Sequence, residues 1–434
     1  MTVVRVAPVD LLRGTVQVPP DKSLTHRALM LAGVSDRAVR IENPLDSADT
    51  AATLGAVEAC GAVAEGRLGE AVVVTGRGLR GLRPPPAIDC ANAGTLMRLF
   101  TGLLVGQRCD RVVLDGDESL RGRPMTRIAK PLRAMGATVA TAPGGTPPLA
   151  VSGGLPLRGI EHRLEVASAQ VKSCVLLAGL FADGTTWVAE PAPSRDHTER
   201  MLEAAGVPLL REGGAVGVAG PVASIDLPDV EVPGDFSSAA ALLVAGALLG
   251  DPEVRLERVN LNPGRTGLLA VMRRMGAEIA EEPAEPVAGE PCGTLVVRRA
   301  GALRGTEVAP EEVPAMVDEL PLVALLGAMA SGTTAVRGAA ELRVKESDRI
   351  TAVVGALRAL GADARELEDG FEVTGTGRLA GGAVDSLGDH RLAMLGAVAG
   401  LVSEGGVAVG GFDAVAVSYP RFARDLAALG GVPA

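Results

Sequence analysis

Aromatic side chains are scarce in this 434-residue chain, because phenylalanine, tyrosine and tryptophan together make up only 2% of it. Proteins that bind single-stranded nucleic acids stack bases on aromatic rings, and nucleic-acid binders in general carry basic surfaces. With a formal net charge of −10 as well, the chain is not expected to bind nucleic acid. Hydrophobic residues still reach 47%, so the core must be packed from alanine, valine and leucine.

Long apolar segments are also missing. No uncharged apolar stretch reaches the ~18 residues needed to span a bilayer, and the most apolar one, residues 236–250, reads as a buried helix. The N-terminus does not have the pattern of a signal peptide. Five cysteines are scattered without CxxC spacing, as expected for reduced thiols. These features predict a cytoplasmic protein with no membrane partner.

Histidines number only four, and none has the spacing of metal ligands, so each reads as an ordinary surface or supporting residue. No Gly-x-x-x-x-Gly-Lys-Ser/Thr loop is present, and nucleotide hydrolysis is therefore not indicated. We expect neither a metal nor another cofactor.

What the sequence does contain is a repeat. Helix-like runs end at a glycine that recurs every 69 to 85 residues, at Gly61, Gly136, Gly206, Gly276, Gly361 and Gly430. Glycine is the usual residue just after a helix end. Each of the first five is followed by a short strand-like run and then by a polar cluster that opens an apolar helix. The pattern predicts an α/β protein of six similar units.

The sixth unit lacks its last strand, and the N-terminal run of residues 3–6 resembles that strand. We infer two lobes of three units each. Residues 20–233 form the first lobe, and residues 1–19 with 234–434 form the second, completed by the N-terminal strand.

Basic residues sit at many of the predicted helix starts, where a cation opposes the helix dipole by ~0.3–1 kcal/mol. They are Lys22, Arg27, Arg195, Lys345, Arg349 and Arg391. A bound phosphate or carboxylate would explain so many. For any single cluster, helix capping by Ser23, Asn92, Ser168 or Ser237 is an equally good explanation. Taken together, the clusters favour several anion-binding loops.

Carboxylates lie among these cations. Asp318 and Glu319 open one helix, and Glu346 lies between Lys345 and Arg349. Such groups can accept or donate protons. The alternative for Glu346 is a salt bridge that holds the basic groups in place.

The ordered motifs resemble the 5-enolpyruvylshikimate-3-phosphate synthases, the family of 3-phosphoshikimate 1-carboxyvinyltransferases. They include DKSLTHR, NAGTLMR, GDESLRGRP, SAQVKS, SRDHTER, NPGRTG, VDELP, LRVKESDR and GDHR, which cover nearly the whole chain. The resemblance implies a two-lobed inside-out α/β barrel of six βαβαββ repeats. It also implies transfer of enolpyruvyl from phosphoenolpyruvate to the 5-hydroxyl of shikimate 3-phosphate. The protein is expected to be a monomer and to close around its substrates.

The resemblance also implies residue roles. Lys22, Asp318 and Glu346 are catalytic: Asp318 takes the hydroxyl proton, and Glu346 with Lys22 protonates the methylene carbon. Shikimate 3-phosphate is expected at Lys22, Ser23, Arg27, Ser168, Gln170, Arg195, Asp318 and Lys345. Phosphoenolpyruvate is expected at Lys22, Gly94, Arg123, Gln170, Arg349 and Arg391.

The chain departs from many relatives at two further positions. Ala169 stands where they have a second serine, and Val417 where they have a lysine. Gly94 keeps the glycine shared by the glyphosate-sensitive members, although Ala169 resembles the tolerant branch.

Two alternative functions remain open from the residues. The sister family transfers enolpyruvyl to UDP-N-acetylglucosamine, but it has Lys-Asn in place of Lys22-Ser23 and a cysteine in place of Glu118. A non-catalytic repeat scaffold that binds an anionic partner would not need Lys22, Asp318 and Glu346 together.

Overall fold

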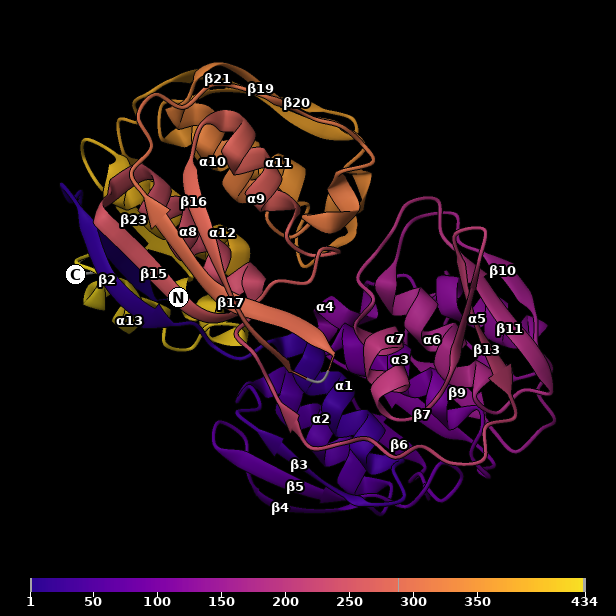
Figure 1. Cartoon of the computed structure of the whole chain (residues 1–434). Helices are drawn as coiled ribbons and strands as arrows, with labels where there is room; N and C mark the ends of the chain where they lie inside the picture. The colour runs from indigo at the N-terminus through magenta and orange to yellow at the C-terminus, as the bar shows by residue number, and fades with distance from the viewer. Residues whose placement is uncertain (1, 288, 432–434) are drawn as a thin grey trace. The chain divides into compact units, whose positions relative to one another are not determined.

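The computed structural model describes residues 2–287 and 289–431 (Figure 1). The chain forms two compact units. Unit 1 comprises Met1–Pro19, Pro233–Glu285 and Pro291–Ala434, and unit 2 comprises Pro20–Val232 and Pro286–Glu290. Each unit has its own hydrophobic core of aliphatic side chains.

Unit 2 contains three four-stranded sheets, ordered β14-β3-β5-β4, β6-β7-β9-β8 and β10-β11-β13-β12. Their strands are β3 (Ala38–Glu42), β4 (Val63–Arg67), β5 (Ala71–Thr75), β6 (Ala87–Asp89), β7 (Val112–Asp115), β8 (Thr138–Ala140), β9 (Leu149–Ser152), β10 (Glu161–Arg163), β11 (Gly184–Ala189), β12 (Leu209–Glu212), β13 (Ala215–Gly220) and β14 (Val230–Glu231).

Unit 1 contains two four-stranded sheets, β2-β15-β17-β16 and β18-β19-β21-β20, and the three-stranded sheet β22-β23-β1. Their strands are β1 (Val3–Val6), β2 (Leu12–Gln17), β15 (Gly250–Asn260), β16 (Glu278–Val287), β17 (Glu290–Arg298), β18 (Glu307–Val308), β19 (Ser331–Val336), β20 (Asp363–Leu367), β21 (Gly370–Thr376), β22 (Gly382–Asp385) and β23 (Val407–Gly410).

All six sheets follow one pairing rule. The first strand in each order is parallel to the second, and the second is antiparallel to the third. In the three-stranded sheet, that third strand is β1 from the N-terminus of the chain, with Val3 opposite Gly410. The predicted α/β architecture of six repeats is therefore confirmed.

Each repeat contributes two helices of different character. The first helix is buried on nearly all sides: α1 (Lys22–Gly33), α3 (Gly94–Leu104), α6 (Ala169–Gly179), α8 (Phe236–Leu249), α10 (Leu320–Met329) and α12 (His390–Val402). Within unit 2, α3 contacts α1 and α6, and within unit 1 the helices α8, α10 and α12 contact one another. Glycine and alanine in these helices allow such close packing.

The second helix of each repeat is partly exposed. These helices are α2 (Ala48–Ala59), α5 (Thr126–Ala134), α7 (His197–Ala204), α9 (Gly267–Met275), α11 (Arg349–Ala359) and α13 (Phe422–Ala428). The six repeat glycines follow them directly, with φ between 84° and 104°. Glycine adopts this left-handed conformation without the penalty that a Cβ brings, so the predicted helix stops are confirmed.

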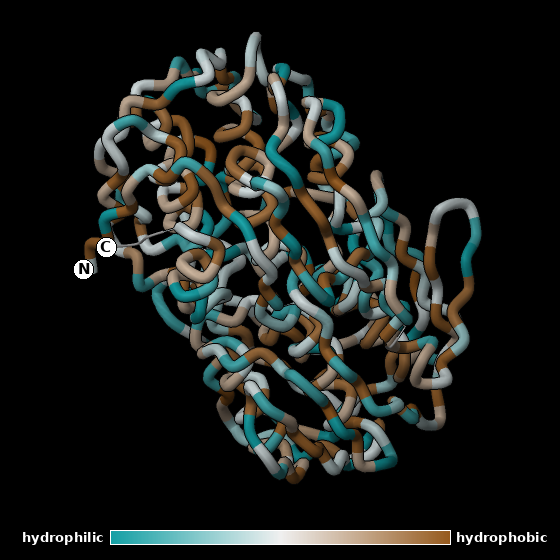
Figure 2. The backbone as a smooth tube through the Cα atoms, turned by 60° about the vertical axis from the view of Figure 1, so that its left-hand side comes forward, coloured by the Kyte–Doolittle hydropathy of each residue, from teal (hydrophilic) through white to brown (hydrophobic). Residues whose placement is uncertain are grey.

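Short segments complete the chain: α4 (Glu118–Arg121) and the 3₁₀ helices η1 (Val313–Ala315), η2 (Ala340–Val344) and η3 (Phe412–Val417). Within each unit the sheets lie on the outside and the buried helices inside (Figure 1). Figure 2 shows the same arrangement as hydrophobic stretches inside the units and hydrophilic loops around them. No helix in residues 2–287 and 289–431 is long and apolar enough to cross a membrane.

Three of the four predicted helix caps are wrong. Ser23 and Ser237 lie inside their helices, and Asn92 precedes Ala93, which caps α3 without a side-chain bond. Only Ser168 caps its helix, by accepting from the backbone N–H of Val171.

Among the described helices, aspartate side chains cap five: Asp21 on α1, Asp117 on α4, Asp235 on α8, Asp348 on α11 and Asp389 on α12. A capping carboxylate offsets the repulsion between the helix dipole and a neighbouring cation.

Candidate active site

In unit 2, the first residue of α1 forms an ion pair with α2. Lys22 Nζ lies 3.1 Å from Asp49 Oδ2, and Asp49 is buried. Burial alone would raise the pKa of the Asp49 carboxyl, but the charge of Lys22 lowers it below its usual 3.8, with a smaller contribution from Arg123. Lys22 and Arg123, predicted to bind substrate from different repeats, therefore act on one carboxylate.

Arg27 lies one turn further along α1 and is almost completely buried. Its Nε donates to Thr198 Oγ1 over 2.7 Å, Nη1 to the carbonyl of Ser23 over 3.0 Å, and Nη2 to Ser173 Oγ over 3.2 Å. Burial lowers the pKa of Arg27 to about 10, and the nearby charge of Arg195 contributes to that lowering. The two arginines predicted to bind shikimate 3-phosphate thus lie close enough to repel each other.

The start of α3 is crowded by two guanidinium groups. A Cβ placed on Gly94 would lie 3.1 Å from Nη1 of both Arg123 and Arg98. Arg123 Nη2 donates to Asn92 Oδ1 over 2.6 Å, and Arg98 Nη1 donates to Gln170 Oε1 over 2.5 Å. Gly94 is therefore the residue that lets two arginines approach the helix start.

Gln170 connects this group to the start of α6. Its Nε2 donates to Thr95 Oγ1 over 2.9 Å, and Ser168 caps the same helix two residues earlier. Ser168 and Gln170, expected to bind shikimate 3-phosphate, therefore lie beside the residues expected to bind phosphoenolpyruvate.

In unit 1, one buried guanidinium group forms hydrogen bonds with three carboxylates. Arg349, the first residue of α11, donates from Nη1 to Asp318 Oδ1 over 3.2 Å, from Nη2 to Glu346 Oε2 over 2.7 Å, and from Nε to Asp389 Oδ2 over 2.7 Å. Lys345 Nζ lies 3.8 Å from Asp318 Oδ1. The two predicted acid–base carboxylates of this unit thus share one arginine.

The charges in this cluster stabilise one another. Burial alone would lower the pKa of Arg349, but the charges of Asp389, Glu346 and Asp318 raise it above its ordinary value. Burial alone would raise the pKa of Asp389, and Arg349 lowers it below the usual 3.8. Since a neutral arginine is excluded here, the carboxylates face a permanent positive charge.

Arg391, the second residue of α12, reaches the start of α8, where its Nη1 donates to the carbonyl of Ser237 over 2.7 Å. Arg265 approaches the same place, with Nη2 2.7 Å from Asp235 Oδ1 and 2.9 Å from Ser237 Oγ. Helices α8, α10, α11 and α12 therefore bring charged side chains together at their starts. For Glu346, the structure shows the salt bridge with Arg349 that the sequence offered as an alternative, and its acid–base role stays a prediction.

Several participants were not predicted as site residues: Asp49, Arg98, Asp389 and Arg265. Asp49 and Asp389 lie in polar clusters that the repeat had already marked, so that signal was available. Arg98 stands within NAGTLMR at the spacing of one helical turn from Gly94, which also points it toward the helix start.

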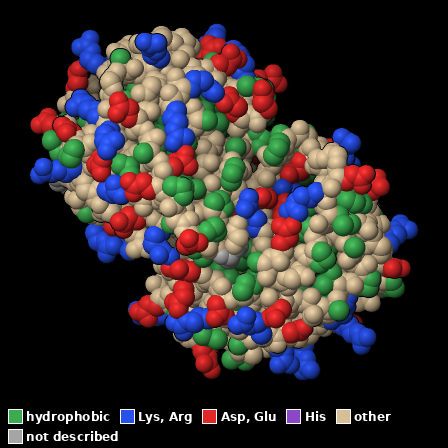
Figure 3. Space-filling model, in the orientation of Figure 1, with side chains coloured by type: hydrophobic (Ala, Val, Ile, Leu, Met, Phe, Trp, Pro, Cys, Tyr) green, Lys and Arg blue, Asp and Glu red, His purple; other side chains and the backbone are tan. Residues whose placement is uncertain are grey.

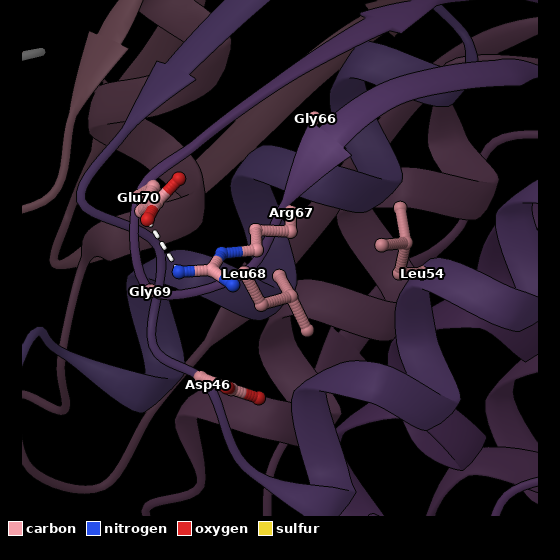
Figure 4. Close-up of a pocket in the computed structure, with 7 residues that line it drawn as sticks. All are labelled: Asp46, Leu54, Gly66, Arg67, Leu68, Gly69 and Glu70. Carbon is pink, nitrogen blue, oxygen red and sulfur yellow. Dashed lines mark hydrogen bonds and ion pairs between the residues drawn. The ribbon is translucent and has the colours of Figure 1, made fainter.

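One surface hollow lies away from these residues. A hollow of about 570 Å³ in unit 2 is lined by Asp46, Leu54 and residues 66–70 at the β4–β5 turn (Figure 4). Arg67 forms an exposed ion pair with Glu70 there. None of the predicted site residues lines it. Figure 3 shows basic and acidic side chains interspersed over the visible surface. In residues 2–287 and 289–431, no group of His, Cys, Asp or Glu could hold a metal ion.

Comparison with known proteins identifies the family of this chain. The sequence profile of EPSP synthase (3-phosphoshikimate 1-carboxyvinyltransferase) matches residues 6–426. The chain belongs to this family. Its reaction is the transfer of enolpyruvyl from phosphoenolpyruvate to shikimate 3-phosphate, a step of the shikimate pathway to aromatic amino acids.

Two relatives named 3-phosphoshikimate 1-carboxyvinyltransferase illustrate the similarity. The protein of Halorhodospira halophila is 47% identical over 98% of this chain and 96% of its own length, and that of Thermus thermophilus is 48% identical over 98% of each. The EPSP synthase structure from Acinetobacter baumannii superposes with a TM-score of 0.89 at 39% identity, over 100% of this chain and 99% of the other.

The enolpyruvyl transferase NikO from Streptomyces tendae superposes with a TM-score of 0.76 at 20% identity, over 100% of this chain and 98% of the other, and shows the shared fold alone. The family assignment decides against a non-catalytic scaffold and against UDP-N-acetylglucosamine as the acceptor.

Proposed function

We propose that Asp318 is the base and that Glu346 and Lys22 supply the proton in this enolpyruvyl transfer. The observation that carries the proposal is Arg349, which holds Asp318 and Glu346 together. Asp318 takes the proton of the 5-hydroxyl while the hydroxyl oxygen bonds to C2 of phosphoenolpyruvate, and a proton adds to the methylene carbon C3. Loss of that proton and of phosphate then restores the double bond.

A carboxyl group must be ionised to accept a proton, and the surroundings of Asp318 suit this form. Its carboxylate faces Arg349 at 3.2 Å and Lys345 at 3.8 Å, and both positive charges favour the ionised form. Lys22 in unit 2 forms an ion pair with Asp49 over 3.1 Å, which holds its ammonium group at the start of α1.

Substrate binding is proposed from the same helix starts. Shikimate 3-phosphate binds Lys22, Ser23, Arg27, Ser168, Gln170, Arg195, Asp318 and Lys345, and phosphoenolpyruvate binds Lys22, Gly94, Arg123, Gln170, Arg349 and Arg391. The guanidinium pairs at Gly94 and at Arg27 give two separate sites of concentrated positive charge in unit 2. Phosphate and carboxylate groups pair strongly with such guanidinium forks.

The remaining proposals concern the protein's setting. We propose that it works as a cytoplasmic monomer without a metal or cofactor. The cysteines at 60, 90, 109, 174 and 292 are all free, as expected in a reducing compartment. The exposed large hydrophobic side chains are single residues scattered along both units.

Release of phosphate from phosphoenolpyruvate, measured with shikimate 3-phosphate as acceptor, tests the function. A parallel reaction with UDP-N-acetylglucosamine should release none. Asp318→Asn and Glu346→Gln should abolish most of the activity, whereas the exposed variants Asp363→Asn and Glu368→Gln of the same unit should keep it. Unchanged activity in either site variant would remove that residue from the mechanism.

A further inference from the structure

A buried ionic cluster lies behind Arg27 and Arg195 and has no part in the steps above. Lys172 lies on α6, and its side chain is only 4% exposed. Its Nζ lies 2.7 Å from Glu190 Oε2, 2.8 Å from Glu199 Oε1 and 3.3 Å from the carbonyl of Ser194. These three acceptors match the three protons of an ammonium group.

The cluster joins three elements and the loop between two of them. Glu190 follows β11, Glu199 belongs to α7, and the loop of residues 191–195 connects these elements. Ser194 is bound twice to Glu190: its backbone N–H donates to Oε2 over 3.3 Å, and its hydroxyl donates to Oε1. The backbone is thereby fixed at the residue immediately before Arg195.

Stability alone does not explain such a cluster. Each buried ion costs several kcal/mol of lost hydration, and well-packed apolar side chains of similar volume would be equally stable or more so. Three apolar side chains near Lys172 on α6, those of Val171, Cys174 and Val175, are buried. Burial alone would lower the pKa of Lys172, but Glu199 and Glu190 raise it, so the ammonium stays charged.

The same cluster acts on the two arginines. Among the charges that favour the ionised form of Arg27, Glu199 has the largest effect, while Arg195 opposes it. Thr198, the residue next to Glu199, accepts the hydrogen bond from Arg27 Nε. The carboxylates of Glu190 and Glu199 therefore support the positions of both Arg27 and Arg195, although these two guanidinium groups repel each other.

We propose that Lys172, Glu190 and Glu199 are positioning residues that fix residues 191–195 and so hold Arg195 beside Arg27, ready for the phosphate of shikimate 3-phosphate. This inference rests on the proposed assignment of Arg27 and Arg195 to that phosphate. Without the cluster, mutual repulsion would move Arg195 away while Arg27, held by Thr198 and Ser173, would remain.

A double-mutant cycle between Lys172 and Arg195 tests the inference, with the dissociation constant of shikimate 3-phosphate measured by calorimetry. Arg195→Ala alone should weaken binding about tenfold or more, the scale of one charged hydrogen bond. Lys172→Met should weaken it by a similar factor, with KM for phosphoenolpyruvate little changed. If Lys172 acts through Arg195, the double variant binds about as weakly as either single variant.

Ser194→Ala covers the case in which Lys172→Met does not fold, because it loosens the loop without leaving a charge unpaired. It should weaken binding by a smaller factor, again without adding to Arg195→Ala. The control is Val175→Ala, a buried substitution on the same helix that lowers stability but should leave binding unchanged.

The outcomes distinguish the assignment of Arg195 to the phosphate from the positioning role of Lys172, Glu190 and Glu199. If Arg195→Ala leaves the affinity unchanged, the assignment of Arg195 to the phosphate is wrong and the inference fails with it. If Arg195→Ala weakens binding but its effect multiplies with that of Lys172→Met or Ser194→Ala, the assignment stands and the positioning role is refuted.

Discussion

Arg349 Nε donates to Asp389 Oδ2 over 2.7 Å, with both side chains buried at the starts of α11 and α12. Asp389 also caps α12 by accepting from the backbone N–H of Arg391 over 2.8 Å. One carboxylate therefore fixes the first residue of one helix and the first turn of another. This bond links the stability of unit 1 to the placing of its acid–base groups.

The first prediction concerns the pH dependence of this pair. Asp389→Asn should lower the free energy of unfolding by about 3 kcal/mol at neutral pH, since it leaves a buried arginine short of one charge partner. Because the folded pKa of Asp389 lies below the usual 3.8, its contribution is full above that value and disappears as the pH falls through the lower folded pKa.

Urea unfolding of the wild type and Asp389→Asn between pH 7 and the acid limit measures this difference. The difference in free energy of unfolding between the two proteins should decrease only at acid pH. Asp363→Asn, exposed on β20, is the control for loss of a carboxylate as such. A difference in free energy of unfolding that is already small at pH 7 would contradict the prediction.

The second prediction concerns the acid–base groups. Lys22→Met, Asp318→Asn and Glu346→Gln should each lower kcat at least ~10²-fold, the usual scale for loss of general acid or base catalysis. Steady-state kinetics at saturating substrates measure this, and circular dichroism checks that each variant is folded. A variant with near-normal kcat would show that its residue has been given the wrong role.

The third prediction compares two arginines. Arg349→Lys should raise KM for phosphoenolpyruvate and also lower kcat, because lysine cannot hold Asp318, Glu346 and Asp389 in the fork geometry of a guanidinium. Arg391→Lys should raise the same KM with less effect on kcat. For both variants, shikimate 3-phosphate binding should change little. Equal kinetic profiles for the two would argue against the joint role of Arg349.

The fourth prediction concerns Gly94. In Gly94→Ala, the new Cβ would lie 3.1 Å from Arg123 and from Arg98, so the two side chains must shift by a few tenths of an ångström. We expect KM for phosphoenolpyruvate to rise several-fold and KM for shikimate 3-phosphate to rise less, as judged by varying each substrate separately. Gly355→Ala, in the open middle of α11, is the matched control. An unchanged KM would mean that Arg123 adapts freely.

The fifth prediction concerns Val417 at the end of η3, which stands where relatives have a lysine. The nearby arginines are already engaged: Arg421 donates to the carbonyl of Gln17 over 3.2 Å, and Arg424 lies 3.3 Å from Asp425. Val417→Lys should therefore add a charge and lower KM for phosphoenolpyruvate by at most about fivefold, the worth of one screened ion pair. A KM that stays constant or rises would show that Val417 serves packing.

The sequence determined the repeats on its own, because their signals are local. A glycine is required where the backbone turns left-handed after a helix, as at Gly276 with φ of 104°, and alternating apolar residues are required where a strand covers a helix. Motif by motif, the sequence also identified the family and the residues proposed to act. None of this depends on which residues meet in space.

The partners of those residues were decided only by the tertiary structure. Sequence alone offered Ser23 and Ser237 as helix caps, but the aspartates two residues earlier cap these helices, since a carboxylate also offsets a nearby cation. It could not show that Arg349 binds Asp389, or that Lys172 meets Glu190 and Glu199, because these contacts join elements that are separated along the chain. A charge that is costly when buried alone becomes stable only where the fold brings its partners to it.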